Sequence, residues 1–406
     1  MSFTSTRLGK IKPSATVALT GLTAELKAAG RDVISLGAGE PDFDTPDNVK
    51  AAAIAAIDRG ETKYTAVDGT PELKAAIAAK FKRENGLDYT ANQITVGAGG
   101  KQVLFNAMAA TLDPGDEVVI PAPYWVSYPD IVLLMEGKPV IVPCPENRRY
   151  KLSPEDLDAA ITPKTKWLIL NSPSNPTGAG YDRDELKALA DVLLDHPQVW
   201  VISDDIYEHI VYDGFEFFTL AQVEPKLYDR TLTLNGVSKA YAMTGWRIGF
   251  AGAPEALIKG IAKVQSQSTT NPCTISQAAA VEALNGPQDY LTEIRSRYRE
   301  RRDVLVQSLA AAGWTVPSPA ATMFAWVPVP ERFSNLGSMA FSKLLLKEAK
   351  VAVSPGIGFG EYGEGFLRIA LVENRQRIRQ AAKNIKTFLS TVESGGEGSK
   401  PRAVAS

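Results

Sequence analysis

The chain has 406 residues, 45% of them hydrophobic and 22% charged, a composition typical of a globular protein with about two domains and a large core. Its formal net charge of −2, without a basic block, argues against binding to nucleic acid or to an anionic membrane surface. Two cysteines and two histidines are too few for a disulfide framework and suggest no metal-ligand cluster. The segment from Met1 to Val17 lacks a long apolar core, and no apolar run reaches spanning length, so we expect a cytoplasmic protein without a membrane segment.

Helical and strand-like segments alternate through the first two thirds of the chain. Helices are expected near residues 46–59, 70–84, 100–111, 126–136, 182–195 and 254–270. Short apolar or β-branched runs, expected to be strands, lie near 94–97, 117–121, 139–142, 167–171, 199–203, 231–234 and 247–252. This alternation predicts an α/β fold with a mostly parallel seven-stranded sheet covered by helices. Ligands of such sheets bind beyond the carboxyl ends of the strands.

The last third of the chain predicts a second, smaller α/β domain. A long charged helix near 287–311 is followed by expected elements at 323–329, 338–349, 351–354, 366–372 and 374–391. We therefore expect an N-terminal arm at 1–45, a large domain at 46–300 and a small domain at 301–392. Residues 393–406 are polar and rich in glycine, which is typical of a disordered tail.

The segment most informative about function runs from Ser238 to Gly249 and carries Lys239 and Arg247. It lies between two strand-like runs, so we expect Lys239 in a loop of small residues at the end of a strand. A lysine amine can form a Schiff base with an aldehyde. A guanidinium can grip a phosphate through two parallel hydrogen bonds. The pair suits a covalently held phosphorylated aldehyde, although a lone lysine is more often a solvated surface residue.

Three other segments place polar or glycine residues directly after apolar strands. Asn175 begins an Asn-Pro-x-Gly turn, Asp204 and Tyr207 follow another strand, and Gly99 and Gly100 lie between a strand and a helix. In this order and spacing, and together with the lysine segment, they resemble the fold-type I pyridoxal-phosphate aminotransferases, the class that includes aspartate aminotransferase. The resemblance covers nearly the whole chain.

The resemblance implies pyridoxal 5′-phosphate as the cofactor, with Lys239 holding its aldehyde and later moving the substrate proton. Asp204 would keep the ring nitrogen protonated, so that the cofactor acts as an electron sink. Asn175 and Tyr207 would both hydrogen-bond the phenolic oxygen of the cofactor, which keeps the pKa of the Schiff base low. Trp125 would stack on the ring. Other interpretations are a turn cap for Asp204, a turn starter for Asn175, an ordinary strand residue for Tyr207 and a core residue for Trp125.

For the phosphate group, the resemblance implies backbone N–H groups at a helix N-terminus and one arginine. The expected residues are Gly99, Gly100, Lys101 and Arg247, with a hydroxyl from Ser238. Relatives often carry a serine three residues before the lysine, where this chain has Gly236, so one phosphate contact would be missing. Tyr64 matches a tyrosine that reaches the phosphate from the neighbouring subunit, which implies a homodimer, although it could be an ordinary exposed loop residue.

The resemblance implies that Trp125 and Asn175, already named for the cofactor, also bind substrate, together with three residues nearer the ends of the chain. Arg368, within an apolar strand, would bind the α-carboxylate through its guanidinium, and Gly39 would close over the substrate. Lys12 is either a partner for a distal substrate carboxylate or an ordinary lysine of the arm.

Two parts of the chain point to different substrates. The first two thirds resemble the bacterial aspartate aminotransferase branch, some members of which also transaminate prephenate. From about Gly313 onward the sequence is similar to bacterial alanine (glutamate–pyruvate) aminotransferases. We expect a ping-pong transfer between an L-amino acid, with aspartate favoured, and a 2-oxo acid such as 2-oxoglutarate. An alanine aminotransferase is the alternative, and a pyridoxal-phosphate-dependent β-lyase is an alternative of another class.

Overall fold

The computed structural model describes residues 3–11 and 15–394, which form two compact units. The first unit contains residues 3–11, 40–296 and 320–323, and the second contains residues 15–39, 297–319 and 324–394. Lys12 and residues 395–406, the greater part of the expected tail, lie outside the described residues.

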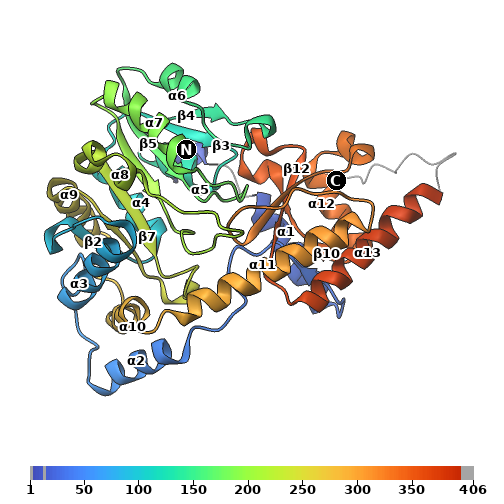
Figure 1. Ribbon diagram of the computed structural model, residues 1–406, viewed down its shortest axis with the longest axis horizontal. Helices are drawn as coiled ribbons and strands as arrows, with labels where there is room; N and C mark the ends of the chain where they lie inside the picture. Colours follow the sequence, from blue (N-terminus) through green and yellow to red (C-terminus); the bar gives the residue numbers. More distant parts are fainter. Residues whose placement is uncertain (1–2, 12–14, 395–406) are drawn as a thin grey trace. The chain divides into compact units, whose positions relative to one another are not determined.

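A seven-stranded sheet forms the centre of the first unit, in the order β2-β8-β7-β6-β5-β3-β4 (Figure 1). Its strands are β2 (Ile94–Gly97), β3 (Glu117–Ala122), β4 (Lys138–Pro143), β5 (Thr165–Asn171), β6 (Trp200–Asp204), β7 (Thr231–Gly236) and β8 (Gly249–Gly252). Strand β8 pairs antiparallel with β2 and β7, and all other pairs are parallel. Every strand except β8 therefore ends at the same edge of the sheet, and the prediction of a mostly parallel seven-stranded sheet is confirmed.

Helices pack on both faces of this sheet because successive strand residues point to opposite sides. Val118 and Ile120 pack with residues of helices α4, α5 and α9. Val119, between them, packs on the other face with residues of α6, α7 and α8. The helices of the first unit are α2 (Asp47–Asp58), α3 (Pro71–Lys80), α4 (Gly100–Thr111), α5 (Ser127–Leu134), α6 (Pro154–Ala160), α7 (Arg183–Asp195), α8 (Leu220–Val223), α9 (Glu255–Ser266) and α10 (Thr274–Asn285). Its short 3₁₀ helices are η1 (Thr6–Lys10), η3 (Ala91–Gln93), η4 (Glu146–Arg148), η5 (Pro225–Arg230) and η6 (Thr244–Trp246), and η2 (Phe81–Asn85) is a π-helix that continues α3.

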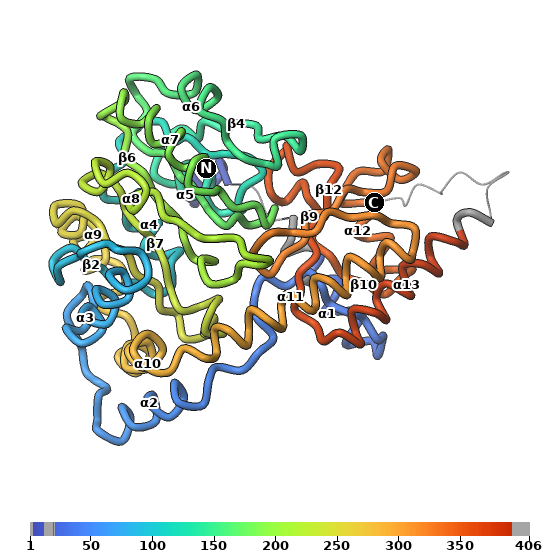
Figure 2. The backbone as a smooth tube through the Cα atoms, in the orientation of Figure 1, coloured from blue at the N-terminus to red at the C-terminus, as the bar shows by residue number. Residues whose placement is uncertain are grey.

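Two small sheets and several helices form the second unit. Strands β11 (Ser354–Pro355), β12 (Phe366–Ala370) and β9 (Phe324–Pro328) make an antiparallel sheet, and β1 (Ile34–Ser35) pairs parallel with β10 (Val351–Ala352). The helices are α1 (Ala15–Ala28), α12 (Ser338–Leu344) and α13 (Arg375–Ser394). Helix α11 (Asp289–Ala310) begins in the first unit, and its residues from 297 onward belong to the second. The short 3₁₀ helices are η7 (Glu331–Leu336), η9 (Gly356–Phe359) and η10 (Glu361–Gly363), and η8 (Leu345–Ala349) is a π-helix. In Figure 2, β1 belongs to the blue part of the tube and β10 to the orange part. The two strands pair although they lie far apart in the sequence.

The two units divide the chain differently from the expected domains. The expected arm at 1–45 is split, because η1 packs beside α5 in the first unit whereas β1 pairs with β10 in the second. Residues 40–45 belong to the first unit and residues 297–300 to the second. Residues 320–323 return to the first unit, where Ala321 forms a bridge with Val211. In the described part of the chain, no helix is both long and apolar enough to cross a membrane.

Candidate active site

Most of the expected cofactor residues of the first unit, though not Tyr64, lie at the carboxyl edge of its sheet. Asn171 and Asp204 are the last residues of β5 and β6, and the parallel pairing sets them side by side. Asp204 also lies beside Leu234, two residues before the end of β7, from which the loop with Lys239 begins. Because these parallel strands end together, residues far apart in sequence lie close together in space.

The Asp204 side chain is buried and accepts a hydrogen bond from the Tyr128 hydroxyl, with 2.6 Å between the oxygens. The Ile206 N–H donates to its other oxygen at 3.4 Å. Burial raises the pKa of Asp204 to about 6, against the opposing effects of the two hydrogen bonds and the charge of Lys239. The pKa of Tyr128 is raised by burial and by Asp204, so Tyr128 stays a hydrogen-bond donor. The result is a buried carboxylate that is mostly ionised at neutral pH.

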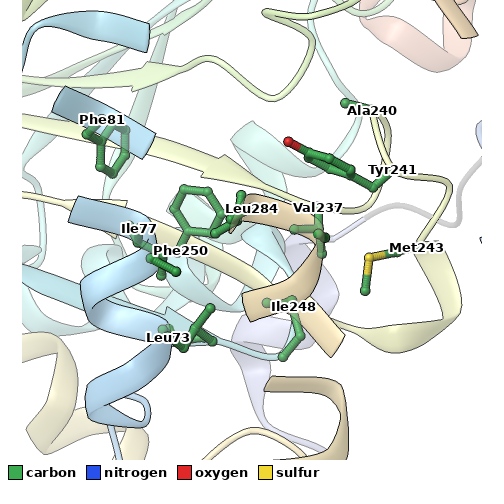
Figure 3. Packing of buried hydrophobic residues seen from close by; sticks show 14 of the residues in the cluster. Leu73, Ile77, Phe81, Val237, Ala240, Tyr241, Met243, Ile248, Phe250 and Leu284 are labelled. Atoms are coloured by element: carbon green, nitrogen blue, oxygen red, sulfur yellow. The ribbon is translucent and has the colours of Figure 1, made fainter. Parts of the chain in front are cut away.

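Buried neighbours hold the lysine loop in place. Val237, Ala240, Tyr241 and Met243 flank half-buried Lys239 and pack into the core cluster that contains Phe250 (Figure 3). The Met243 N–H donates to the Ser238 carbonyl at 3.1 Å, which closes the loop. The loop is thus fixed by its apolar side chains, while the lysine between them lies near enough to Asp204 to lower its pKa.

Asn171 links two of the expected site segments. Its side-chain oxygen accepts from the Asn175 N–H at 2.9 Å, and its amide nitrogen donates to the Asp204 carbonyl at 2.8 Å. Asn175 and Tyr207 are both buried, at 7% and 3% exposure. Asn171 and Tyr128 were not predicted as site residues from the sequence. An amide at a strand end was the available signal for Asn171, whereas nothing in the sequence connects Tyr128 to Asp204.

The residues expected to bind the phosphate lie close together where α4 begins. Gly99 precedes the helix with φ of +86°, a conformation open to glycine, and a Cβ there would lie 2.3 Å from Nη2 of Arg247. Gly249 is equally constrained, since its Cβ would lie 2.1 Å from the Gly100 nitrogen. Arg247 donates to the carbonyls of Thr244 at 2.9 Å and Ala98 at 3.3 Å. The glycines therefore let a guanidinium lie close to the N-terminus of a helix. The Gly99 N–H, expected to bind the phosphate, donates instead to the Gly97 carbonyl at 2.8 Å, which leaves Gly100 and Lys101 as the expected backbone donors.

Two other positions, at the start of the lysine loop and at the end of β7, concern the expected phosphate contacts. Ser238 is 8% exposed. A Cβ at Gly236 would lie 3.1 Å from the Ile248 carbonyl oxygen and 3.2 Å from Cδ1 of Ile206, so a serine would be crowded there. Gly236 is thus closely packed at the end of β7.

Trp125 follows β3 and is half-buried. Its ring meets that of Tyr128 edge to face, with 5.3 Å between centroids and 85° between planes. The Lys101 ammonium lies 4.8 Å from the Trp125 ring centroid. Burial, followed by the charge of Arg247, lowers the pKa of Lys101. Trp125 thus contacts the phenol that holds Asp204.

Tyr64 is 90% exposed. Together with Thr270, Asn271 and Cys273 it lines an open hollow of about 640 Å³. Its hydroxyl belongs to the surface of the first unit, apart from the buried residues around Asp204.

The second unit brings Arg368 and Gly39 together. Arg368 lies on β12 and is 6% exposed, with its guanidinium carbon 4.2 Å from the Phe324 ring centroid. Its Nη2 donates to the Gly37 carbonyl at 3.1 Å and to the Ser354 hydroxyl at 3.4 Å. A Cβ at Gly39 would lie 3.7 Å from the same nitrogen. Arg368 is thus oriented by polar neighbours and packed against an aromatic ring.

The family described as aminotransferase class I and II matches residues 31–385. This chain belongs to that family. The aspartate/prephenate aminotransferase of Cereibacter sphaeroides is 56% identical to it over 397 residues, which cover 96% of this chain and 99% of the relative. The crystal structure of the aspartate aminotransferase from Rhizobium meliloti has a TM-score of 0.89 and 51% identity, covering 95% of this chain and 98% of its own. The Thermus thermophilus aspartate aminotransferase with maleate has a TM-score of 0.89 and 43% identity, covering 95% and 100%.

Membership of this family confirms the expected cofactor, pyridoxal 5′-phosphate. The residues at the sheet edge fit that group. Lys239 offers an amine, Asp204 offers a buried carboxylate for a ring cation, and the surroundings of Gly99 offer donors for a phosphate.

Proposed function

We propose that this aminotransferase moves the amino group of aspartate to a 2-oxo acid such as 2-oxoglutarate by a ping-pong mechanism. The observation that supports the reaction best is Lys239 beside the buried carboxylate of Asp204, at the edge where the parallel strands end. The substrate is suggested by relatives named for aspartate whose alignments cover 94% or more of this chain. These alignments include most of the segment after Gly313, which resembles alanine aminotransferases. Prephenate enters the proposal because the Cereibacter sphaeroides relative is named for it as well.

Each residue at the sheet edge has a separate role in this proposal. When bound, the cofactor supplies an electron sink for the bond that breaks at the substrate Cα. Lys239 holds the aldehyde and then carries the proton. Asp204 holds the ring nitrogen in its protonated form, and Tyr128 and Asn171 keep Asp204 in position.

Other residues set the place and charge of the ring. Asn175 and Tyr207 donate hydrogen bonds to its phenolic oxygen, which favours the anionic form of that oxygen. Trp125 covers one face of the ring. The phosphate is held by the N–H groups of Gly100 and Lys101, by Arg247 and by the Ser238 hydroxyl, while the Gly99 N–H stays bonded to the Gly97 carbonyl.

Substrate binding uses the second unit and the arm. Arg368 takes the α-carboxylate, because its guanidinium is buried and already oriented by the Gly37 carbonyl and Ser354. Gly39, beside it, leaves space for that carboxylate. Lys12 is proposed as the partner of the second carboxylate of aspartate.

We also propose a cytoplasmic homodimer in which Tyr64 of each subunit reaches the phosphate bound by the other. The 90% exposure of Tyr64 leaves its side chain accessible to a partner subunit, as this proposal requires. Size measurement of wild type and Tyr64→Phe tests the assembly, and cofactor affinity of the same variant tests the contact. A monomeric wild type would contradict this part of the proposal.

The central test is the variant Lys239→Ala, with Lys263→Ala on the exposed face of α9 as its control. Borohydride reduction followed by peptide mass measurement should place a cofactor adduct on Lys239 in wild type and in the control. Lys239→Ala should lose transamination from aspartate to 2-oxoglutarate while remaining folded. Near-normal turnover of that variant, or an adduct on another lysine, would refute the assignment.

A second experiment tests the substrate. We expect kcat/KM to be higher for aspartate than for alanine, and a single turnover with aspartate alone should release one oxo acid per site without ammonia. Release of ammonia would favour a β-lyase, and a preference for alanine would favour the alternative aminotransferase. Lys12→Ala should lower kcat/KM for aspartate more than for alanine, whereas Lys10→Ala, at an exposed position of η1, should change neither.

A further inference from the structure

A buried acid, Glu208, directly follows Tyr207 in sequence and is 6% exposed. One of its carboxylate oxygens accepts from Nδ2 of Asn235 at 2.7 Å, and the other accepts from Nδ2 of Asn85 at 3.0 Å. Its third partner is the ammonium of Lys80, which is 1% exposed. Three elements of the first unit therefore meet at one carboxylate, which the expected site roles leave unused.

The charges around Glu208 are balanced within this group. Lys80 also lies 3.4 Å from Glu84, which contacts Nε2 of His209 at 2.9 Å. Glu84, Glu208 and His209 lie close enough together to hold a metal ion, a grouping that the sequence analysis did not foresee, but Lys80 already supplies a cation to both acids. Although burial raises the pKa of Glu208, the charges of Lys80 and His209 outweigh that effect and lower it. Glu208 is thus an ionised acceptor at neutral pH.

Asn235 connects Glu208 to the lysine loop. It lies in β7, four residues before Lys239, and its side-chain oxygen accepts from the Gly236 N–H at 2.7 Å. Next to it, the Leu234 carbonyl accepts from the Asp205 N–H at 2.9 Å. The turn that carries Tyr207 and the strand end that carries the lysine loop are therefore joined twice, once by backbone and once through the Glu208 carboxylate.

We infer that Glu208 is a positioning residue: by holding Asn235, it sets the Tyr207 hydroxyl at the correct distance from the ring bound to Lys239. The inference rests on the proposed roles of Tyr207 and Lys239. Glu208 itself is expected to touch neither substrate nor cofactor. It acts through the two segments that it joins.

A measurable consequence follows from the role of Tyr207. A hydrogen bond to the phenolic oxygen keeps the lysine-bound cofactor unprotonated, so a misplaced Tyr207 raises the pH midpoint of the visible absorbance change. We expect Glu208→Gln to raise this midpoint by about one pH unit, a roughly tenfold change in the protonation equilibrium. We also expect kcat/KM for aspartate to fall by about tenfold or more, because misplacement near 1 Å can cost about a hundredfold.

The matched control is Glu84→Gln. It removes a carboxylate from the same group, since Glu84 pairs with Lys80, Arg83 and His209, but it leaves the bond from Asn235 to Glu208 in place. Both variants should lower the melting temperature of the holoenzyme. Only Glu208→Gln should move the absorbance midpoint. Equal midpoints in wild type, Glu208→Gln and Glu84→Gln would reduce Glu208 to a stabilising role and overturn the inference.

A second variant covers the case in which Glu208→Gln does not fold. Asn235→Ala cuts the link to β7 while Glu208 keeps its ion pair with Lys80. It should raise the midpoint in the same direction, and an unchanged midpoint would again overturn the inference. Borohydride labelling of Lys239 in wild type keeps the two hypotheses apart: its absence would refute the proposed function, whereas its presence with unchanged midpoints would refute only the role of Glu208.

Discussion

Replacing Asp204 by asparagine in the cofactor-free protein should stabilise the fold at neutral pH. The carboxylate is buried, and the pKa of Asp204 is raised from 3.8 to about 6, first by burial. Asparagine has nearly the same shape and can still accept the hydrogen bond from Tyr128. The substitution therefore removes a charge whose burial is unfavourable while keeping the main contact of the side chain.

The size of the effect follows from the pKa difference, 6 − 3.8, or about 2 pH units. At about 1.4 kcal/mol per unit, the charge of Asp204 destabilises the apoprotein by roughly 3 kcal/mol at pH 7. The sign is set by proton binding: between about pH 4 and pH 6 the folded state holds more protons than the unfolded state, so stability falls as the pH rises. Below about pH 4 Asp204 is protonated in both states, and the advantage of asparagine should vanish.

Urea unfolding of both apoproteins between pH 3.5 and 8 measures this difference. The control is Asp116→Asn, because bonds from Lys166 and the Asp113 N–H outweigh burial and lower the pKa of Asp116. Its variant should be less stable than wild type at neutral pH, and that gap should close on acidification. If Asp204→Asn shows no gain at pH 7, or a gain that does not depend on pH, the reasoning about the buried charge is wrong. With cofactor bound, the same substitution should instead weaken cofactor affinity, since the ring cation loses its partner.

Three further substitutions test other parts of the site. Gly99→Ala should weaken cofactor binding by about tenfold or more, because the added Cβ would lie 2.3 Å from the Arg247 guanidinium and because alanine disfavours a φ of +86°. An unchanged dissociation constant for the cofactor, measured by equilibrium titration, would contradict the proposed phosphate site. Arg368→Lys should raise KM for aspartate by roughly tenfold to a hundredfold, because lysine cannot make the bidentate contact with the carboxylate. An unaltered KM in steady-state kinetics would exclude Arg368 as the carboxylate ligand. Asn171→Ala should lower stability by about 1–3 kcal/mol, since it removes two hydrogen bonds between the Asn175 turn and the end of β6; a denaturation midpoint equal to wild type would show that this bridge adds no net stability.

Much of the fold could be predicted because local patterns determine it. Each of the seven expected strands of the large sheet appears within a few residues of its predicted position. Helices α1, α6, α8 and α10 were not expected. Helix α6 is short and begins with a Ser153 cap, and α10 is rich in alanine and buried along much of its length, so neither shows a clear amphipathic repeat.

Pairing across the sheet is a tertiary property. Strand β8 follows β7 in sequence and inserts between β7 and β2, which brings Gly249 against Gly100 and Arg247 against Gly99. The sequence shows an arginine and two glycine-rich turns, but their shared location depends on this strand order.

The sequence by itself determined which residues stand at strand ends, because alternating apolar runs and turn residues act over a few neighbouring positions. Lys239, Asp204 and Asn175 could therefore be placed at one sheet edge in advance. The tertiary structure alone decided how they are supported: the hydroxyl of Tyr128 on Asp204 and the carboxylate of Glu208 on Asn235 join residues from separate elements. Such contacts depend on which buried polar groups remain to be satisfied after the helices and strands have packed, and no local pattern records that.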